Sequence, residues 1–536
     1  MCGILAVIGK DIEAGKIRSL SKRMSHRGPD ESGLKITDKG YVLSHERLSI
    51  VDLTTGIQPI QGTNSAWMVH NGEIYNHMAL RNNELKDHTF RTTGDSEVIV
   101  HLYEEYGYDF VDMLDGVFSF VIIDGDDFIV GRDPIGVKPL YYGTDEKGAL
   151  WFASEMKSLA DHCVEFSAFP PGHYYTPETG FVRYYTPEWF DSEKAVQPAD
   201  LTKLRESLIE ATRKRLMADV PLGVLLSGGL DSSLTSSIAA RLMESSEQKL
   251  HSFSIGLDAE APDLIAARKV AEFLGTEHHE IHFSVEEGIE ILEKLVWHLE
   301  TYDVTSIRAS TPMYFLSKAI AEKGIKVVLS GEGSDEILGG YLYFKNAPSA
   351  KEFQKETIRR VQRLATADCL RADKSTMAHG LEARVPFLDK DFLKTAMEMV
   401  PEEKMPVTYD GVEKYILRKA FDTPERPFLP EEVLWRQKEQ FSDGVGYNWI
   451  DQLIEYASKQ VSDAQMETAA ERFPVNTPAT KEAYFYRELF AKHFPQEPAA
   501  KTVKRWIPKW QKDLDPSGRA NETHVAPGMK KEMAKI

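Results

Sequence analysis

A short apolar run that leads into a glycine-rich turn, at residues 224–233, constrains the fold more than any other part of the chain. Val-Leu-Leu has the length and character of a buried strand, Ser-Gly-Gly forms a turn, and Leu-Asp-Ser-Ser opens a helical pattern that continues to Leu242. Adjacent glycines let backbone N–H groups approach an anion, and a helix start adds partial positive charge. The stretch predicts a strand, a phosphate-binding loop and a helix, while a turn without a ligand stays open for these residues alone.

The loop differs from that of kinases and GTPases, because no lysine follows its glycines. The order Ser-Gly-Gly-Leu-Asp-Ser at residues 227–232 resembles instead the pyrophosphate loop of enzymes that split ATP between the α and β phosphates to adenylate an acid or a carbonyl. The resemblance implies an ATP-binding role for five residues of the loop: Ser227, Gly228, Gly229, Asp231 and Ser232.

From about residue 201 onward, helical patterns alternate with short buried strands, which predicts a parallel α/β sheet. The expected strands cover 224–226, 252–256, 280–283 and 326–329. Ligands of such sheets bind beyond the carboxyl ends of the strands, where both the loop at 227–232 and the polar segment 330–336 lie. We therefore expect Asp231 and Asp335 to lie close together and to hold Mg²⁺ on the phosphates of ATP, because Mg²⁺ binds one or two carboxylates together with phosphate oxygens.

The chain begins Met1-Cys2-Gly3, and the small second residue permits removal of the methionine. Cys2 would then carry both a thiol and a free α-amine. The amine titrates at about 7.7–8.0 and accepts the proton of a thiol whose own pKa is about 8.5. Cys2 is therefore a candidate nucleophile that brings its own base.

Four polar motifs interrupt runs of strand character in the first part of the chain. They occupy residues 26–30 (His-Arg-Gly-Pro-Asp), 44–52 (Ser-His-Glu-Arg-Leu-Ser-Ile-Val-Asp), 69–76 (Val-His-Asn-Gly-Glu-Ile-Tyr-Asn) and 93–97 (Thr-Gly-Asp-Ser-Glu). In order and spacing they resemble the glutaminase domain of the N-terminal-nucleophile amidotransferases. The resemblance implies the hydrolase fold of that family, an α+β sandwich with layers in the order αββα.

The same resemblance assigns roles around the nucleophile. Arg47 would pair with the α-carboxylate of glutamine, as guanidinium geometry favours. Asp95 and the region of Glu73 would hold its α-ammonium group. The Asn71 side chain and the Gly72 N–H would form the oxyanion hole for the tetrahedral intermediate.

Further motifs at 300–310, 380–389 and 436–444, together with those above, resemble the glutamine-hydrolysing asparagine synthetases over nearly the whole chain. The implied reaction joins aspartate to ATP as β-aspartyl-AMP, which ammonia from glutamine converts to asparagine. Glutamate, AMP and pyrophosphate are the other products. The implied organisation is a glutaminase domain at 1–185, a linker at 186–200, an ATP-pyrophosphatase domain with a helical C-terminal part at 201–520, and a flexible tail at 521–536.

In the second domain the family pattern implies several further contacts. Glu332 would serve adenylate formation or the attack by ammonia, and Lys438 would stabilise charge on the phosphates. The remaining nucleotide contacts would be Leu226, Ile255, Ser330 and Gly331. Two alternatives stay open, namely a related adenylating or β-lactam-closing enzyme and an inactive glutamine or nucleotide sensor.

Composition limits the partners and the compartment. A net charge of −19 argues against general nucleic-acid binding, which needs excess Lys and Arg. Three scattered cysteines provide no disulfide framework, and we find neither a signal peptide nor an apolar stretch of about 18 residues. We expect a cytoplasmic protein, away from membranes, that takes aspartate, glutamine and ATP as its partners. Association into a homodimer is left open.

Three weaker expectations complete the analysis. His278, Glu280 and His282 alternate along one strand face and could form a metal site. Without further ligands nearby, we favour a strand face whose side chains are solvated or satisfied by protein partners. The basic segment from Lys501 to Ile536 is expected to be extended or disordered. An internal passage should carry ammonia between the domains, walled by segments near Met113, Val117 and Leu225.

Overall fold

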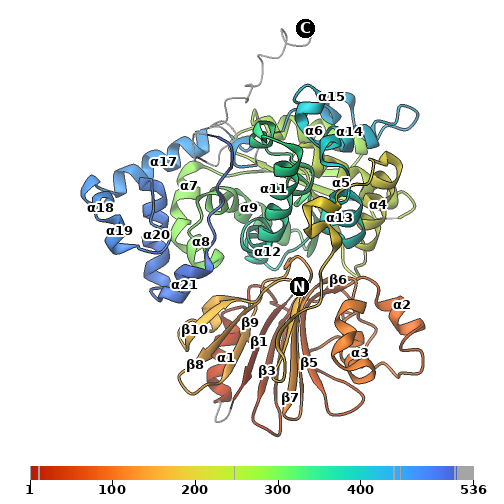
Figure 1. Cartoon of the computed structure of the whole chain (residues 1–536), viewed down its shortest axis with the longest axis vertical. Coiled ribbons are helices and arrows are strands. Elements are labelled where there is room, and N and C mark those ends of the chain that lie inside the picture. The colour runs from red at the N-terminus through yellow and green to blue at the C-terminus, as the bar shows by residue number, and fades with distance from the viewer. Residues whose placement is uncertain are drawn as a thin grey trace.

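The computed structural model describes residues 2–9, 13–246, 248–438, 441–446, 448–511 and 515. Two parts lie one above the other in Figure 1, a lower part made mostly of strands and an upper part made mostly of helices. The start of the chain lies where the two parts meet, and the segment that connects the parts crosses the same boundary.

Two six-stranded antiparallel sheets form the lower part. The first sheet has the order β10 (Cys163–Ala168), β8 (Tyr141–Asp145), β9 (Leu150–Ala153), β1 (Gly3–Ile8), β3 (Val42–Arg47) and β2 (Glu31–Ile36). The second sheet has the order β12 (Gly180–Arg183), β11 (His173–Thr176), β7 (Asp127–Arg132), β6 (Gly116–Asp124), β5 (Trp67–Ile74) and β4 (Ile60–Gln61). Helix α1 (Ala14–Lys22) packs on the first sheet, and helices α2 (His77–Asn82) and α3 (Glu97–Tyr106) pack on the second.

The alternation of side chains along β1 explains the layering. Ile4 and Ala6 pack between the two sheets against residues such as Val121 of β6, whereas Leu5 and Val7 pack on the opposite face with α1. A strand with apolar residues on both faces requires cover on both faces. The result is the predicted αββα sandwich, with α3 covering the outer face of the second sheet.

A five-stranded parallel sheet organises the upper part. Its order is β15 (Glu277–His282), β14 (His251–Gly256), β13 (Leu222–Leu225), β16 (Val327–Leu329) and β17 (Glu382–Arg384). The first four are the predicted strands, displaced by one to three residues at most of their ends. Strand β17 was not predicted, because a buried Glu-Ala-Arg tripeptide has no apolar pattern.

Helices cover both faces of this sheet. Leu225 and Phe253 face α9 (Val304–Glu322), whereas Val224 faces α5 (Leu230–Leu242). The other helices between residues 201 and 397 are α4 (Leu201–Lys214), α6 (Pro262–Leu274), α7 (Val285–Glu290), α8 (Leu292–Leu299), α10 (Ser334–Leu338), α11 (Ala350–Arg363), α12 (Asp368–Met377) and α13 (Lys390–Met397). The C-terminal helices are α14 (Tyr415–Phe421), α15 (Glu431–Leu434), α16 (Phe441–Gly444), α17 (Asn448–Gln460), α18 (Asp463–Glu467), α19 (Ala469–Arg472), α20 (Lys481–His493) and α21 (Glu497–Thr502).

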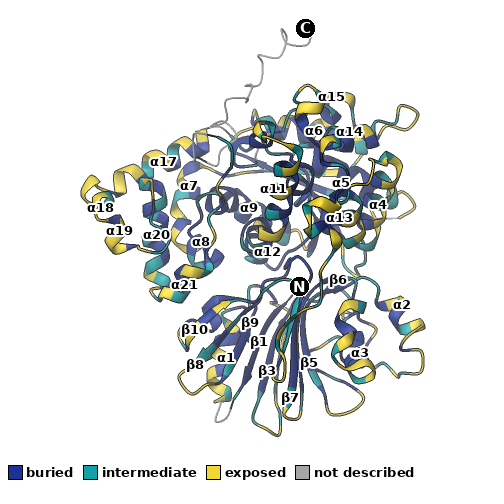
Figure 2. Cartoon of the chain, in the orientation of Figure 1, coloured by how far each residue is buried: buried dark blue, intermediate teal, exposed yellow. Residues whose placement is uncertain are grey.

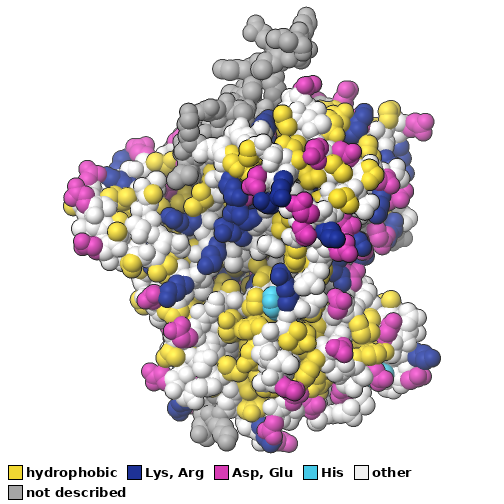
Figure 3. Space-filling model, in the orientation of Figure 1, with side chains coloured by type: hydrophobic (Ala, Val, Ile, Leu, Met, Phe, Trp, Pro, Cys, Tyr) yellow, Lys and Arg dark blue, Asp and Glu magenta, His cyan; other side chains and the backbone are white. Residues whose placement is uncertain are grey.

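The buried residues, dark blue in Figure 2, lie mainly in the strands of both parts and in the centre of the upper part. The described part of the chain has no helix long and apolar enough to cross a membrane. On the face shown in Figure 3, Lys and Arg side chains gather on the upper part near the boundary, so the net charge of −19 is unevenly distributed.

The segment predicted as a linker, 186–200, is packed rather than loose. The side chain of Trp189 is 0% exposed and joins the core around Leu204 and Leu208 of α4. Farther along, the backbone of Gln197 pairs with the chain at Glu398 and Val400. A segment without periodicity can still be held by one large apolar side chain and a few backbone hydrogen bonds.

The segment after Lys501 is also anchored where the structure describes it. Trp506 is 6% exposed and packs edge-on against Tyr341, and Asp515 forms an ion pair with Arg308. Of the two predicted states, disorder is wrong for residues 501–511, because buried aromatic surface outweighs the excess of positive charge. Residues 503–511 have no helix or strand, and Lys501 and Thr502 end α21. The tail predicted at 521–536 lies outside the described residues.

We expect Trp189→Ala to destabilise the protein, because the indole is fully buried between the connecting segment and α4. The loss should be about 3–5 kcal/mol in the free energy of unfolding, as for other large-to-small core substitutions. Urea denaturation followed by circular dichroism measures it. Val196→Ala, at a side chain that is 62% exposed in the same segment, is the control and should change the midpoint little.

Candidate active sites

The phosphate loop lies directly after β13, between the strand and α5. Gly228 has a φ of 69°, and a Cβ atom there would lie 2.5 Å from Ala266 of α6. Both the conformation and the close approach require glycine. The hydroxyl oxygens of Ser227 and Ser232 are 2.9 Å apart, so the loop closes on itself around the start of α5.

The segment 330–336 meets this loop, as the strand order predicted. A Cβ atom on Gly331 would lie 2.7 Å from the backbone nitrogen of Ser232, and the Ser334 hydroxyl donates to Asp231 Oδ1 at 2.8 Å. The two loops follow neighbouring strands, β13 and β16, so their contact is a consequence of sheet topology.

Two lysines hold the aspartates that we predicted as magnesium ligands. Lys414 Nζ lies 2.5 Å from Asp231 Oδ2 and 2.7 Å from Asp335 Oδ1, and Lys438 Nζ lies 2.8 Å from Asp335 Oδ2. Burial by itself would raise the pKa of Asp335, but the two ammonium groups outweigh it and hold that pKa at about 2. The Asp335 carboxylate therefore stays ionised, and the two lysines compensate the charge of the aspartates within the site.

Glu332 forms an ion pair with Arg371 of α12, and both side chains are substantially buried. Burial raises the pKa of Glu332 above its ordinary value, while Arg371 counters the shift. A carboxylate tuned in this way accepts a proton more readily than an exposed one.

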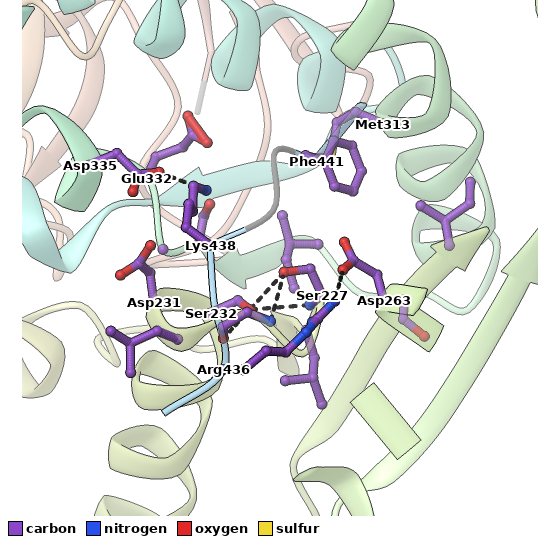
Figure 4. A pocket seen from close by; sticks show the side chains of 18 of the residues that line it. Ser227, Asp231, Ser232, Asp263, Met313, Glu332, Asp335, Arg436, Lys438 and Phe441 are labelled. Atoms are coloured by element: carbon purple, nitrogen blue, oxygen red, sulfur yellow. Dashed lines mark hydrogen bonds and ion pairs between the residues drawn. The ribbon is translucent and has the colours of Figure 1, made fainter. Parts of the chain in front are cut away.

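These groups line one cavity, shown in Figure 4, with Lys438 beside Asp335 and Glu332, and Met313 and Phe441 at its other side. The predicted nucleotide residues that line it are Leu226, Ser227, Gly229, Asp231, Ser232, Ile255, Ser330 and Gly331. Gly228 lies in the same loop, and its carbonyl accepts a hydrogen bond from Arg436, which also pairs with Asp263. Polar loops at one side and an apolar wall at the other suit a nucleotide.

A second cavity surrounds Cys2 at the start of β1. The residues predicted around glutamine that line it are Arg47, Gly72, Glu73 and Asp95. Cys2 is 7% exposed, its backbone N–H donates to Asn71 Oδ1 at 2.9 Å, and burial raises the pKa of its thiol. The structure thus brings the predicted nucleophile and its predicted partners together.

Asn71 and Gly72 on β5 have the geometry of an anion-binding pair. The side-chain nitrogen of Asn71 is buried and has no hydrogen-bond partner among the described residues. Gly72 has a φ of 148°, and a Cβ atom there would lie 2.0 Å from the carbonyl oxygen of Val117. An orphaned donor beside an obligatory glycine is consistent with an oxyanion hole.

The charged groups of this cavity are already engaged. Arg47 pairs with Glu31 and donates to the carbonyl of Asp52. Asp95 accepts the backbone N–H of Ile74 at 2.7 Å, and burial raises its pKa. Burial also raises the pKa of Glu73 well above its ordinary value.

Arg384 connects the two cavities. Its guanidinium lies 3.2 Å from Glu73 Oε1, while its backbone carbonyl accepts the N–H of Ser330 at 2.8 Å. Glu382, two residues earlier on β17, also pairs with its side chain. One fully buried residue thus contacts both the lining of the Cys2 cavity and the second loop of the nucleotide cavity.

The three segments expected to wall a passage differ in position. Val117 packs in a core cluster shared with Leu226 and Leu230, and Leu225 lines the nucleotide cavity. Met113 packs with the core of the lower part around Phe110. The Met113 side chain thus faces the core of the lower part, while the adjacent Leu114 carbonyl accepts a hydrogen bond from Lys390 of the upper part.

The functional residues that we missed are Arg371, Lys414, Arg384 and Arg436. Each is a single basic residue with no phosphate-loop motif around it, and Lys414 is 183 residues from Asp231 in the chain. Arg384 lies within the motif at 380–389, which marked the segment as informative without showing its partner.

Comparison with known proteins agrees with this geometry. A family model described as asparagine synthase matches residues 203–353 and 345–515, and one described as a glutamine amidotransferase domain matches residues 1–184. Glutamine-hydrolyzing asparagine synthetase 2 of Arabidopsis thaliana is 53% identical, over 98% of this chain and 96% of its own. The probable glutamine-hydrolyzing asparagine synthetase of Dictyostelium discoideum is 52% identical, over 98% of this chain and 100% of its own.

Proposed function

The chain belongs to the glutamine-hydrolysing asparagine synthetases, and we propose that its two cavities divide the family's reaction between them. Asparagine is made from aspartate and glutamine at the expense of ATP. One observation carries the division of labour: predicted glutamine residues and predicted ATP residues line two separate cavities, and Arg384 contacts a lining residue of each. An enzyme that closes a β-lactam has no need of the Cys2 cavity, and an inactive sensor has no need of the complete set of charged groups.

Cys2 is proposed as the nucleophile of the glutaminase cavity. Removal of Met1 would leave the α-amine of Cys2 at the nitrogen that now donates to Asn71 Oδ1. The amine takes the thiol proton, the sulfur bonds to the amide carbon of glutamine, and the amide nitrogen leaves as ammonia with that proton. Water then hydrolyses the thioester to glutamate.

Asn71 and Gly72 would stabilise the oxyanion of this reaction. The free side-chain donor of Asn71 and the N–H of Gly72 meet the charge that develops on the carbonyl oxygen. Arg47 would exchange part of its contact with Glu31 for the α-carboxylate of glutamine, and Glu73 and Asp95 would face its α-ammonium group.

The second cavity is proposed to adenylate aspartate. The β-carboxylate of aspartate bonds to the α-phosphorus of ATP as the bond to pyrophosphate breaks. Ser227, Gly229 and Ser232 would bind the leaving pyrophosphate, and Lys438 and Lys414 would offset its charge by turning from the aspartates to the phosphates. Ammonia then attacks the acyl carbon and AMP leaves, with Glu332 as the acceptor of the proton that the attacking nitrogen loses.

Asp231 and Asp335 are proposed to hold Mg²⁺ together with ATP. Two carboxyl groups that follow neighbouring strands are a suitable donor set, because Mg²⁺ binds few carboxylates and several phosphate or water oxygens. The ion would supply neutralisation of phosphate charge. Both lysines occupy the aspartate oxygen atoms that the metal ion would bind. Because the phosphates of ATP would draw the lysines away, metal and nucleotide should bind together.

A cytoplasmic location is proposed from cysteine usage, since Cys2, Cys163 and Cys369 are all free and buried. Association of two copies remains a prediction for sedimentation analysis.

The Cys2→Ala variant should lose glutaminase activity and glutamine-dependent synthesis, because no other group in that cavity replaces the thiol. Synthesis from ammonium salts should persist. Product analysis with each nitrogen source measures both, and Cys163→Ala is the matched control. Mass spectrometry should find Met1 absent from the active protein. Loss of the ammonia-dependent reaction in Cys2→Ala would contradict the separation of the two sites.

Asp231→Asn, Asp335→Asn and Lys414→Gln should each suppress formation of AMP and pyrophosphate by about 10²-fold or more, whichever nitrogen source is used. Each change removes charge from the cluster that would hold the phosphates. Glutaminase activity should remain in all three. Asp463→Asn, at an exposed carboxylate paired with Lys481, controls for the loss of one negative charge. Release of ADP instead of AMP would show that the loop does not direct attack to the α-phosphorus.

Ammonia is proposed to travel between the cavities inside the protein, because ammonium in neutral water has no lone pair with which to attack. Apolar residues at the boundary, such as Val117 and Leu225, would not protonate it. With amide-labelled glutamine and excess unlabelled ammonium, asparagine should retain label well beyond the free-mixing ratio. Complete dilution of the label would exclude an internal route.

A further inference from the structure

Three side chains with metal-ligating atoms converge at the far end of the parallel sheet from the nucleotide cavity. His251 begins β14 and Glu277 begins β15, and these two residues are paired in register. His279 lies two positions beyond Glu277, so it is on the same face of the edge strand. The set therefore follows from strand pairing and not from spacing in the sequence.

The ligand atoms lie at distances suited to one small ion. His251 Nδ1 is 3.1 Å from His279 Nε2, and Glu277 Oε1 is 3.7 Å from the first nitrogen and 3.6 Å from the second. Tetrahedral bonds of about 2.0–2.1 Å place ligand atoms about 3.3–3.4 Å apart. An ion can therefore lie about 2.0 Å from all three ligand atoms, which is within the range of Zn²⁺ bonds to nitrogen and carboxylate oxygen.

The surroundings keep the imidazole groups available. The ring of His279 stacks on that of Phe253 and on that of His251, with planes inclined by 23° and 15°. The side chain of Glu277 is 51% exposed, so an ion can enter from solvent.

We propose that His251, Glu277 and His279 bind a divalent transition-metal ion of the Zn²⁺ class at the amino-terminal edge of the parallel sheet. Three protein ligands leave a fourth position for water. The phosphate-binding loop follows the opposite end of β13, so the three ligands do not face the phosphates, although Phe253, on which His279 stacks, also lines the nucleotide cavity. The ion connects the edge strand β15 to β14 and stabilises the folded chain, because the unfolded chain does not hold the three groups together.

The opposite face of β15 carries the residues that the sequence had suggested. His278 is hydrogen-bonded with Ser252 and Ser254, and Glu280 forms an ion pair with Arg268. The prediction of a solvated or satisfied face is confirmed, with protein partners for His278 and Glu280 and an exposed His282. His278 therefore provides a matched control, since it is a histidine on the same strand with the other orientation.

The test is calorimetric titration of Zn²⁺ into chelator-stripped, full-length protein. All proteins carry Cys2→Ala, so that the thiol does not bind the metal. The starting protein should bind one Zn²⁺ ion. His251→Gln and His279→Gln should each lower the Zn²⁺ affinity at least about 10-fold, whereas His278→Gln should leave it unchanged. Glu277→Gln should weaken binding as well, and its exposed side chain makes misfolding an inadequate explanation.

Two further readouts separate a built site from incidental binding. Co²⁺ should give the visible absorption of tetrahedral coordination in the starting protein and in His278→Gln, and lose it in His279→Gln. Saturating Zn²⁺ should raise the melting temperature of the same two proteins only. Equal Zn²⁺ affinity in all variants, or an equal loss in His278→Gln and His279→Gln, would overturn the proposal and leave a hydrogen-bonded histidine pair.

Discussion

The buried guanidinium of Arg384 is the interaction on which the arrangement of the two active sites depends. It pairs with Glu73 of the glutaminase part and with Glu382 on its own strand, and it also donates to the carbonyls of Arg215 and Met217. Removing one partner of a buried charge set leaves the others uncompensated, at a cost of about 3–5 kcal/mol. The pairing of Arg384 with Glu73 therefore keeps β17 beside the glutamine cavity. The loop at Ser330 stays with β17, because the Ser330 N–H donates to the Arg384 carbonyl.

The nucleotide cavity solves a related problem of concentrated charge. Asp231 and Asp335 lie together only because Lys414 and Lys438 compensate them, and Glu332 lies in the same cavity only because Arg371 does so. An incoming triphosphate brings negative charge that these cations can bind in turn. Binding of substrate then exchanges one set of ion pairs for another, which costs less than creating charge contacts in an empty apolar pocket.

Other charged groups join the two parts away from the reacting atoms. Glu300 accepts backbone N–H groups of Met156 and Lys157 and pairs with Lys374, while Arg27 pairs with Asp373. All of these contacts are buried, and those of Glu300 with the backbone and of Arg27 with Asp373 cross the boundary between the parts. Such an interface favours a fixed relation between the cavities, which the proposed transfer of ammonia would require.

The sequence by itself determined the local chemistry: the Ser-Gly-Gly turn after a buried strand, the thiol at position 2, and the glycine at position 72. Turn geometry and strand alternation depend on neighbouring residues, so these features and the parallel α/β sheet could be predicted from local patterns, whereas the αββα sandwich was predicted from the resemblance of the motifs to a known family. The tertiary structure alone decided which cations face Asp231, which strand carries Arg384, and which histidines converge at the sheet edge. The pairing of Lys414 with Asp231 joins residues 183 positions apart, and a lone lysine, arginine or histidine has no local pattern that reveals its partner. Burial makes such partners obligatory, but only the folded chain brings them within reach of one another.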